Sequence, residues 1–217
     1  MTRSIVVALF ALIMPLLAHA DAAEPFKEGQ QYYRIAEPVR PRNPQKIEVV
    51  EVFWYGCPHC YRFDPLIKTW QKTLPADVDF YRMPVIWNST TQLHAQAFYT
   101  AQALGVLDKM HDPLFEALNV QGNPLNNRDK IEQLFVQHGV SADQFKKAFD
   151  SFGVTSQVNQ AKARTLGYKV EGTPEIIVAG KYRIDGRSLG DTERASHEKM
   201  LEVANFLIEK ERQAAKK

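Results

Sequence analysis

The chain has 217 residues, of which 45% are hydrophobic, 24% charged and 11% aromatic. These fractions are typical of a globular protein and exclude intrinsically disordered, collagen-like and low-complexity chains. The formal net charge is only +2. Because a nucleic-acid-binding protein normally carries a strongly basic surface, we expect no nucleic-acid partner.

The first twenty residues are typical of a signal peptide. Arg3 supplies a positive charge, residues 5–17 form an apolar run, and residues 18–20 (Ala-His-Ala) have the small-x-small pattern of a cleavage site. The apolar run is shorter than the roughly 20 residues that a membrane-spanning helix needs. We therefore expect cleavage after Ala20 and a soluble mature protein outside the cytoplasm.

The chain contains only two cysteines, Cys57 and Cys60, which are separated by Pro58 and His59. Exported proteins mostly use cysteines for structural disulfides. A bridge across a loop of about four residues would contribute only about 2 kcal/mol, and a chain of this length has enough core without it. Covalent haem attachment needs a histidine directly after the second cysteine, where this chain has Tyr61. The pair therefore indicates a redox-active dithiol.

A zinc site is a further alternative for the cysteine pair. Such a site needs a second pair of ligands at short spacing. The histidines His94, His111 and His138 are far apart along the chain, and it has no further cysteine. We therefore expect neither a metal nor another cofactor.

The predicted elements begin after a polar, proline-rich segment over residues 21–46. Residues 47–54 (IEVVEVFW) are rich in β-branched and aromatic residues and predict a strand, as do residues 78–85. A helix is expected between them, from Cys57-Pro58 to about Thr73, because proline suits the first position of a helix.

Apolar residues recur at helical spacing from about Thr90 to Phe152, with interruptions at Gly105 and Gly139. Residues 141–144 have the form of a capping box, which marks a helix start. This segment therefore predicts a compact helical subdomain.

β-structure then returns, followed by one helix. Residues 175–179 and 182–184 flank a Gly-Lys pair and predict a hairpin. A last helix is expected from about Thr192, and its predicted buried residues are Met200, Val203, Ala204 and Leu207.

The element order predicts an α/β fold with a helical insertion. We divide the chain into a signal peptide (1–20), a first α/β part (21–88), the inserted helical domain (89–152) and a second α/β part (153–217).

Cys57 is expected where the first strand gives way to the helix. Its sulfur would face unpaired backbone N–H groups and the positive end of the helix dipole. Both favour the thiolate, so we expect a depressed pKa for Cys57. His59 can add a donor or a positive charge there, or it is a solvated loop histidine. Cys60, one turn into the helix, is expected to be more buried and to act as the resolving cysteine.

Residues 53–63 (FWYGCPHCYRF) resemble the active-site segment of the DsbA family of thiol:disulfide oxidoreductases. Residues 172–174 (Gly-Thr-Pro) resemble the cis-proline loop of that family, and the match extends over nearly the whole mature chain. The resemblance implies a thioredoxin fold with an inserted α-helical domain. It also implies a cis bond before Pro174, which would present the backbone of Thr173 beside Cys57 for an extended substrate.

The resemblance further implies an oxidant located in the periplasm. Its partners would be unfolded exported proteins with free thiols and a DsbB-type inner-membrane quinone reductase that reoxidises it, and we expect a monomer. A substrate thiolate would attack Cys57 and release Cys60, and a second would displace Cys57. The implied catalytic residues are Cys57, Cys60, His59, Pro58 and Glu51, and the implied substrate-binding residues are Thr173 and Pro174.

Glu51 interrupts an otherwise apolar strand, at a position where the family carries a buried acid. There it would exchange protons with Cys60, and burial would raise its pKa. The alternative is a surface glutamate on a strand edge. Where the family often has a lysine on the neighbouring strand, this chain has Arg82, which stays protonated and cannot relay a proton.

Thr173 is a second departure, because typical DsbA proteins have valine before the cis-proline. Its hydroxyl group would alter the redox poise or the release of mixed disulfides. Two other functions stay open at this point. A disulfide isomerase of the DsbC type would need an N-terminal dimerisation domain longer than residues 21–46. A copper chaperone is disfavoured because Met83, Met110 and Met200 are scattered along the chain.

Overall fold

The computed structural model describes residues 24–187 and 189–216. The predicted signal peptide lies outside these residues. The helices and strands follow in the order β1 (Tyr33–Arg34), β2 (Ile47–Phe53), α1 (Pro58–Trp70) with a short 3₁₀ turn η1 (Gln71–Thr73), β3 (Val78–Pro84), α2 (Ser89–Ala103), α3 (Leu107–Asn119), α4 (Arg128–Gln137), α5 (Ala142–Phe149), α6 (Phe152–Gly167), β4 (Glu175–Val178), β5 (Tyr182–Asp185) and α7 (Glu193–Ala214). None of the helices described is both long and apolar enough to cross a bilayer.

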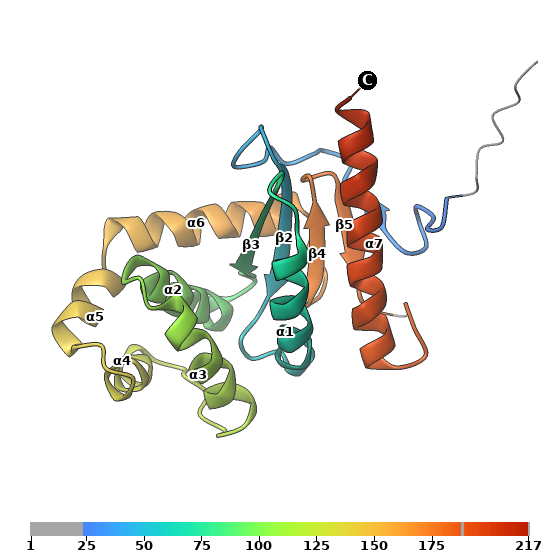
Figure 1. The fold of residues 1–217 in the computed structure, drawn as a ribbon. Coiled ribbons are helices and arrows are strands. Elements are labelled where there is room, and N and C mark those ends of the chain that lie inside the picture. The colour runs from blue at the N-terminus through green and yellow to red at the C-terminus, as the bar shows by residue number, and fades with distance from the viewer. Residues whose placement is uncertain (1–23, 188, 217) are drawn as a thin grey trace, which may run out of the picture.

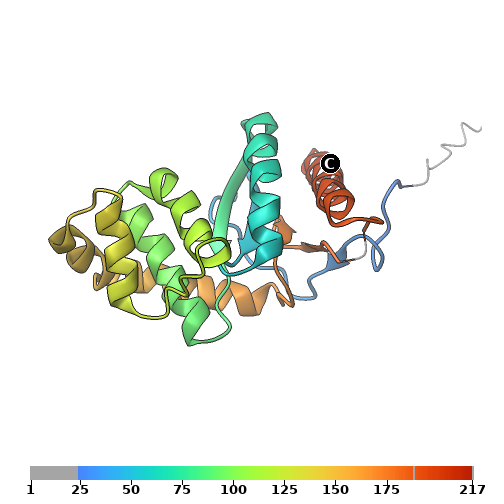
Figure 2. The ribbon, with the colours of Figure 1, turned by 90° about the horizontal axis from the view of Figure 1, so that it is seen from below.

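The strands form one mixed sheet in the order β1-β5-β4-β2-β3. β2 is parallel to β3 and antiparallel to β4, and its residue Glu51 lies opposite Arg82 on one side and Ile176 on the other. Helices α1 and α7 cover one face of the sheet, and α6 runs across the other face (Figures 1 and 2). The central strand β2 is therefore covered on both faces, in agreement with its nearly continuous apolar sequence.

Side chains along β2 alternate between the two faces of the sheet and contribute to two hydrophobic cores. Val49 belongs to the core that the sheet forms with α1 and α7, and that core contains the four residues predicted to be buried in the last helix. Val50 and Val52 belong to the core shared with the helical insertion and α6. Because α1 packs against the first core, its N-terminus is held at the carboxyl end of β2.

Helices α2 to α5 form the insertion beside the sheet, between β3 and α6 (Figure 1). The predicted capping box at Ser141 is confirmed: its hydroxyl accepts the N–H of Gln144, whose side chain accepts the N–H of Ser141. The sequence reasoning assigned no element to residues 152–167, which form α6, nor to β1, which pairs with β5. The predicted boundary between residues 152 and 153 falls at the start of α6, and the division of the chain stays a prediction.

Candidate active site

Cys57 is the N-cap residue of α1, as predicted. Its backbone is extended (φ −92°, ψ 114°), and Pro58 follows at the first helical position. The Cys57 sulfur accepts the backbone N–H of Cys60 at 3.5 Å. Cys57 is 6% exposed and Cys60 is fully buried. Only Cys57 is therefore open to a reaction partner.

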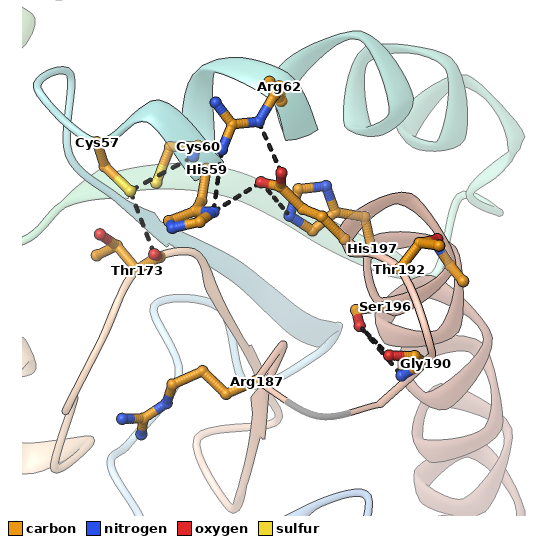
Figure 3. Close-up of polar contacts among 12 residues, drawn as sticks. Cys57, His59, Cys60, Arg62, Thr173, Arg187, Gly190, Thr192, Ser196 and His197 are labelled. Atoms are coloured by element: carbon orange, nitrogen blue, oxygen red, sulfur yellow. Dashed lines mark hydrogen bonds and ion pairs between the residues drawn. The ribbon is translucent and has the colours of Figure 1, made fainter.

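The loop before β4 meets Cys57 from the other side. In its thiol form Cys57 donates to the backbone carbonyl of Thr173, with the sulfur and the oxygen 3.2 Å apart (Figure 3). The bond between Thr173 and Pro174 is cis, which confirms the prediction. Residues 57 and 173 are thus brought together by the pairing of β2 with β4.

The two cysteines have opposite acid strengths. Hydrogen bonds from Cys60, from the Thr173 side chain and from the backbone N–H groups of Cys60 and His59 lower the pKa of Cys57 to about 5. Burial raises the pKa of Cys60 well above its ordinary value, and the proximity of Cys57 raises it further. At neutral pH, the reduced pair therefore holds a thiolate at Cys57 and a thiol at Cys60.

Glu51 is buried, which excludes the alternative of a surface glutamate. Arg82 on β3 places its Nε atom 2.9 Å from Glu51 Oε2, as an ion pair without hydrogen-bond alignment. Burial raises the pKa of Glu51 to about 7, although Arg82 lowers it. Glu51 in turn contributes to the raised pKa of Cys60. An acid that titrates near neutrality thus lies close enough to Cys60 to affect its charge.

The charged cluster continues from Arg82 toward the surface. Asp64 on α1 lies 3.3 Å from Arg82, 2.7 Å from Lys68 and 3.1 Å from His111 on α3. Burial opposes ionisation of Asp64, but these partners lower its pKa below the ordinary value. Arg82 is therefore shared between two carboxylates, and the helical insertion contributes one end of the cluster.

His59 points toward the start of α7 (Figure 3). Its Nδ1 atom lies 2.7 Å from Glu193, whose other carboxylate oxygen accepts from Arg62 at 2.8 Å. Because a carboxylate only accepts, Nδ1 must carry the proton in this contact. Arg62 and His59 lower the pKa of Glu193. His59, on the first turn of α1, is therefore paired with Glu193, while its side chain stays 61% exposed, and its catalytic role stays a prediction.

A cleft of about 310 Å³ lies between the cis-proline loop, His59 and the start of α7. It is lined mainly by polar and charged residues from three parts of the chain. These residues are His59, Gly172, Thr173, Pro174, Asp185, Gly186, Arg187, Glu193, Ser196 and His197. The residues that the sequence proposed for substrate binding, Thr173 and Pro174, thus share one cleft with His59. Within residues 24–187 and 189–216, no three side chains of the metal-binding types come together in a possible metal site.

The model of the DSBA-like thioredoxin domain family matches residues 76–195. Over 197 residues the chain is 44% identical to the thiol:disulfide interchange protein DsbA of Pseudomonas syringae pv. tomato, covering 91% of this chain and 90% of that protein. The chain belongs to the DsbA family. A crystal structure of Pseudomonas aeruginosa DsbA superimposes with a TM-score of 0.83 at 38% identity, covering 90% of this chain and 99% of the other.

Membership of the DsbA family confirms two predictions. The fold is a thioredoxin-like sheet with an inserted helical region, and the protein is a thiol:disulfide interchange oxidoreductase with Cys57 and Cys60 as its CXXC pair. A crystal structure of DsbA from Xylella fastidiosa agrees, with a TM-score of 0.77 at 32% identity over 86% of this chain and 98% of that one. The copper chaperone considered as an alternative is therefore wrong.

The helical insertion of this DsbA-family protein holds the segment before the cysteines, a feature that the sequence reasoning missed. Trp54 donates to His94 at 2.9 Å, with the two rings nearly parallel, and the Tyr55 hydroxyl lies 3.0 Å from His111. Asn119 also donates to the Tyr55 carbonyl at 2.8 Å. The two histidines weighed above as zinc ligands thus fix the aromatic residues that lead into Cys57.

Proposed function

We propose that this DsbA-family protein is an oxidant that acts in the periplasm and donates its Cys57–Cys60 disulfide to unfolded exported proteins. The observation that carries the proposal is that the Cys57 sulfur caps α1 and accepts the backbone N–H of Cys60, whereas Cys60 is fully buried. A stabilised Cys57 thiolate favours the reduced protein, so electrons flow toward it and the substrate is oxidised. A DsbB-type quinone reductase of the inner membrane would then remove the two electrons.

The first step is the attack of a substrate thiolate on the Cys57 sulfur. A bond forms between the two sulfurs, the Cys57–Cys60 bond breaks, and the electron pair goes to Cys60. Because burial raises the pKa of Cys60, this thiolate takes up a proton. Glu51, with a pKa of about 7, is the buried acid that can supply it. Arg82 keeps its proton and only tunes the field around Glu51.

The second step releases the oxidised substrate. A second substrate thiolate attacks the substrate sulfur of the mixed disulfide, the new substrate disulfide forms, and Cys57 leaves as a thiolate. Its lowered pKa makes it a good leaving group. In both steps the substrate backbone would pair as an added strand with Thr173, beside Pro174 and Cys57. His59, held by Glu193, would line the same cleft as Thr173 and Pro174.

Two measurements test this proposal. The reduction potential against glutathione should be clearly more oxidising than that of a cytosolic reductant, whereas a reductant-like value would contradict it. Cys60→Ala should accumulate mixed disulfides with exported proteins, because the resolving thiol is absent. Cys57→Ala should accumulate none. Equal trapping by both variants would show that Cys57 is not the attacked sulfur.

A further inference from the structure

The buried acid Glu175 is not used by the proposed mechanism. It opens β4 directly after Pro174 and is fully buried. The next three residues of the strand are apolar, and an acid at this position costs free energy unless its oxygens find partners. One oxygen, Oε2, has no hydrogen-bond partner among the described residues. The hydrogen bonds of Glu175 are made by the other oxygen.

That oxygen, Oε1, binds the loop that leads to the active site. It accepts the backbone N–H of Glu171 at 3.2 Å and that of Gly172 at 3.0 Å. Thr173, the next residue, places its carbonyl 3.2 Å from the Cys57 sulfur. The two anchored N–H groups are therefore the last two before the residue that meets Cys57.

Arg183 on β5 holds the same loop through a second set of contacts. It donates to the carbonyl of Lys169, lies 3.3 Å from the Glu171 carboxylate and lies 3.8 Å from Glu175 Oε1. Burial raises the pKa of Glu175 to about 7, with Arg183 and the two N–H groups acting against it. The two hydrogen bonds to Glu175 do not require an ionised carboxylate, because the carbonyl oxygen of a protonated carboxyl group also accepts hydrogen bonds.

We propose that Glu175 is a positioning residue for disulfide exchange with peptide substrates. Its carboxyl oxygen fixes the loop from Glu171 to Thr173, so that the backbone of Thr173 is held in place for strand pairing with the substrate. This inference rests on the strand-pairing step of the proposed function. It predicts a selective effect, since a small dithiol that makes no backbone contact gains nothing from an ordered loop.

The test compares three reductants of the oxidised protein. These are a cysteine-containing peptide, the same peptide with methylated amide nitrogens beside the cysteine, and dithiothreitol. Methylation removes the peptide N–H that would donate to the Thr173 carbonyl, and the loss of one backbone hydrogen bond corresponds to a rate ratio of about fivefold between the two peptides. We expect that ratio for the wild-type chain, measured by acid quench and thiol counting.

Three variants carry the argument. Glu175→Leu has a similar volume but no acceptor, and we expect its peptide ratio to fall to about twofold or less while its rate with dithiothreitol stays within about twofold of wild type. Glu175→Gln keeps the acceptor oxygen and should keep the wild-type ratio. Glu48→Leu is the matched control. It removes another buried acid of the sheet, held by Arg164 at 3.0 Å at the end of β2 remote from Cys57, and should also keep the ratio.

The outcomes separate the inference from the function on which it rests. A wild-type ratio near one would contradict strand pairing itself, and with it this role. A wild-type ratio that persists in Glu175→Leu, or that is lost equally in Glu175→Gln, would overturn the role of Glu175 alone. Loss of the ratio in Glu48→Leu would show that general destabilisation is the cause, which also overturns it.

Discussion

Reduction of the Cys57–Cys60 pair should stabilise the fold at pH 7 and destabilise it at pH 5. The pKa of Cys57 falls from the ordinary value of 9.0 to about 5 in the folded protein. For an acid whose folded pKa is depressed, the stabilisation is complete above the unfolded pKa and is lost as the pH falls through the folded one. At pH 7 the solution is about two pH units above the folded pKa of Cys57, so the thiolate adds about 3 kcal/mol to the free energy of unfolding of the reduced form. At pH 5 this contribution is less than about 0.5 kcal/mol.

The disulfide contributes an opposing stabilisation to the oxidised form. Closing a loop of about four residues lowers the entropy of the unfolded chain by an amount worth about 2 kcal/mol at any pH. The reduced form should therefore be more stable than the oxidised form by about 1 kcal/mol at pH 7 and less stable by about 1.5 kcal/mol at pH 5. The two forms should be equally stable between about pH 6 and 6.5. Cys60 does not contribute in this range, because its raised pKa keeps it protonated.

Urea unfolding of both redox forms from pH 5 to pH 8, followed by circular dichroism, measures this difference directly. Reduced Cys57→Ser is the control, since it lacks the thiolate and its stability should not gain the same increment above pH 5. Repeating the series with Glu51→Gln removes the titration of the acid that contributes to the raised pKa of Cys60. An oxidised form that is more stable at pH 7, or a gap that does not change with pH, would refute the assignment of the thiolate to Cys57.

Three further variants test the remaining contacts of the site. Thr173→Val removes a side chain that lowers the pKa of Cys57, so the pKa of Cys57 should rise, as measured by the ultraviolet absorbance of the thiolate. An unchanged pKa would show that the Thr173 side chain serves only in packing. Glu51→Gln should flatten the loss of stability between about pH 4.5 and 7, because a raised folded pKa stabilises only below it; equal slopes in urea unfolding would contradict this. Glu193→Gln removes the carboxylate that neutralises Arg62 and should lower the pKa of Cys57 by a fraction of a unit in low salt. Glu198→Gln, an equal charge change on the exposed side of the same helix, should leave that pKa unchanged, and equal effects of both would point to net charge alone.

The sequence was sufficient for the parts of the site that lie close together along the chain. Proline after Cys57 predicts the helix start, and the N-cap geometry follows from it. Glu51 was found because an acid in an apolar strand is conspicuous. In both cases the signal is local, since neighbouring residues create the environment that gives the side chain its chemistry.

Contacts between distant segments left no local signal. Glu193 reaches His59 across 134 positions, and at the start of a helix a glutamate is ordinary. Glu175 was predicted only as the first residue of a strand, and the pairing of that strand with β2 and β5 shows that it is buried. Helix α6 was missed because its buried residues are few and small or β-branched, so its apolar face is weak in the sequence.

The two halves of the redox centre are made at different times. Synthesis proceeds from the N-terminus, so the strand and helix that carry Cys57 and Cys60 exist before the chain has made β4, which follows the whole helical insertion. Until β4 pairs with β2, the loop of Thr173 cannot reach Cys57. A chain that ends prematurely before β4 thus keeps both thiols but lacks the surface on which a peptide would dock. Complete synthesis is therefore a requirement for a complete active site.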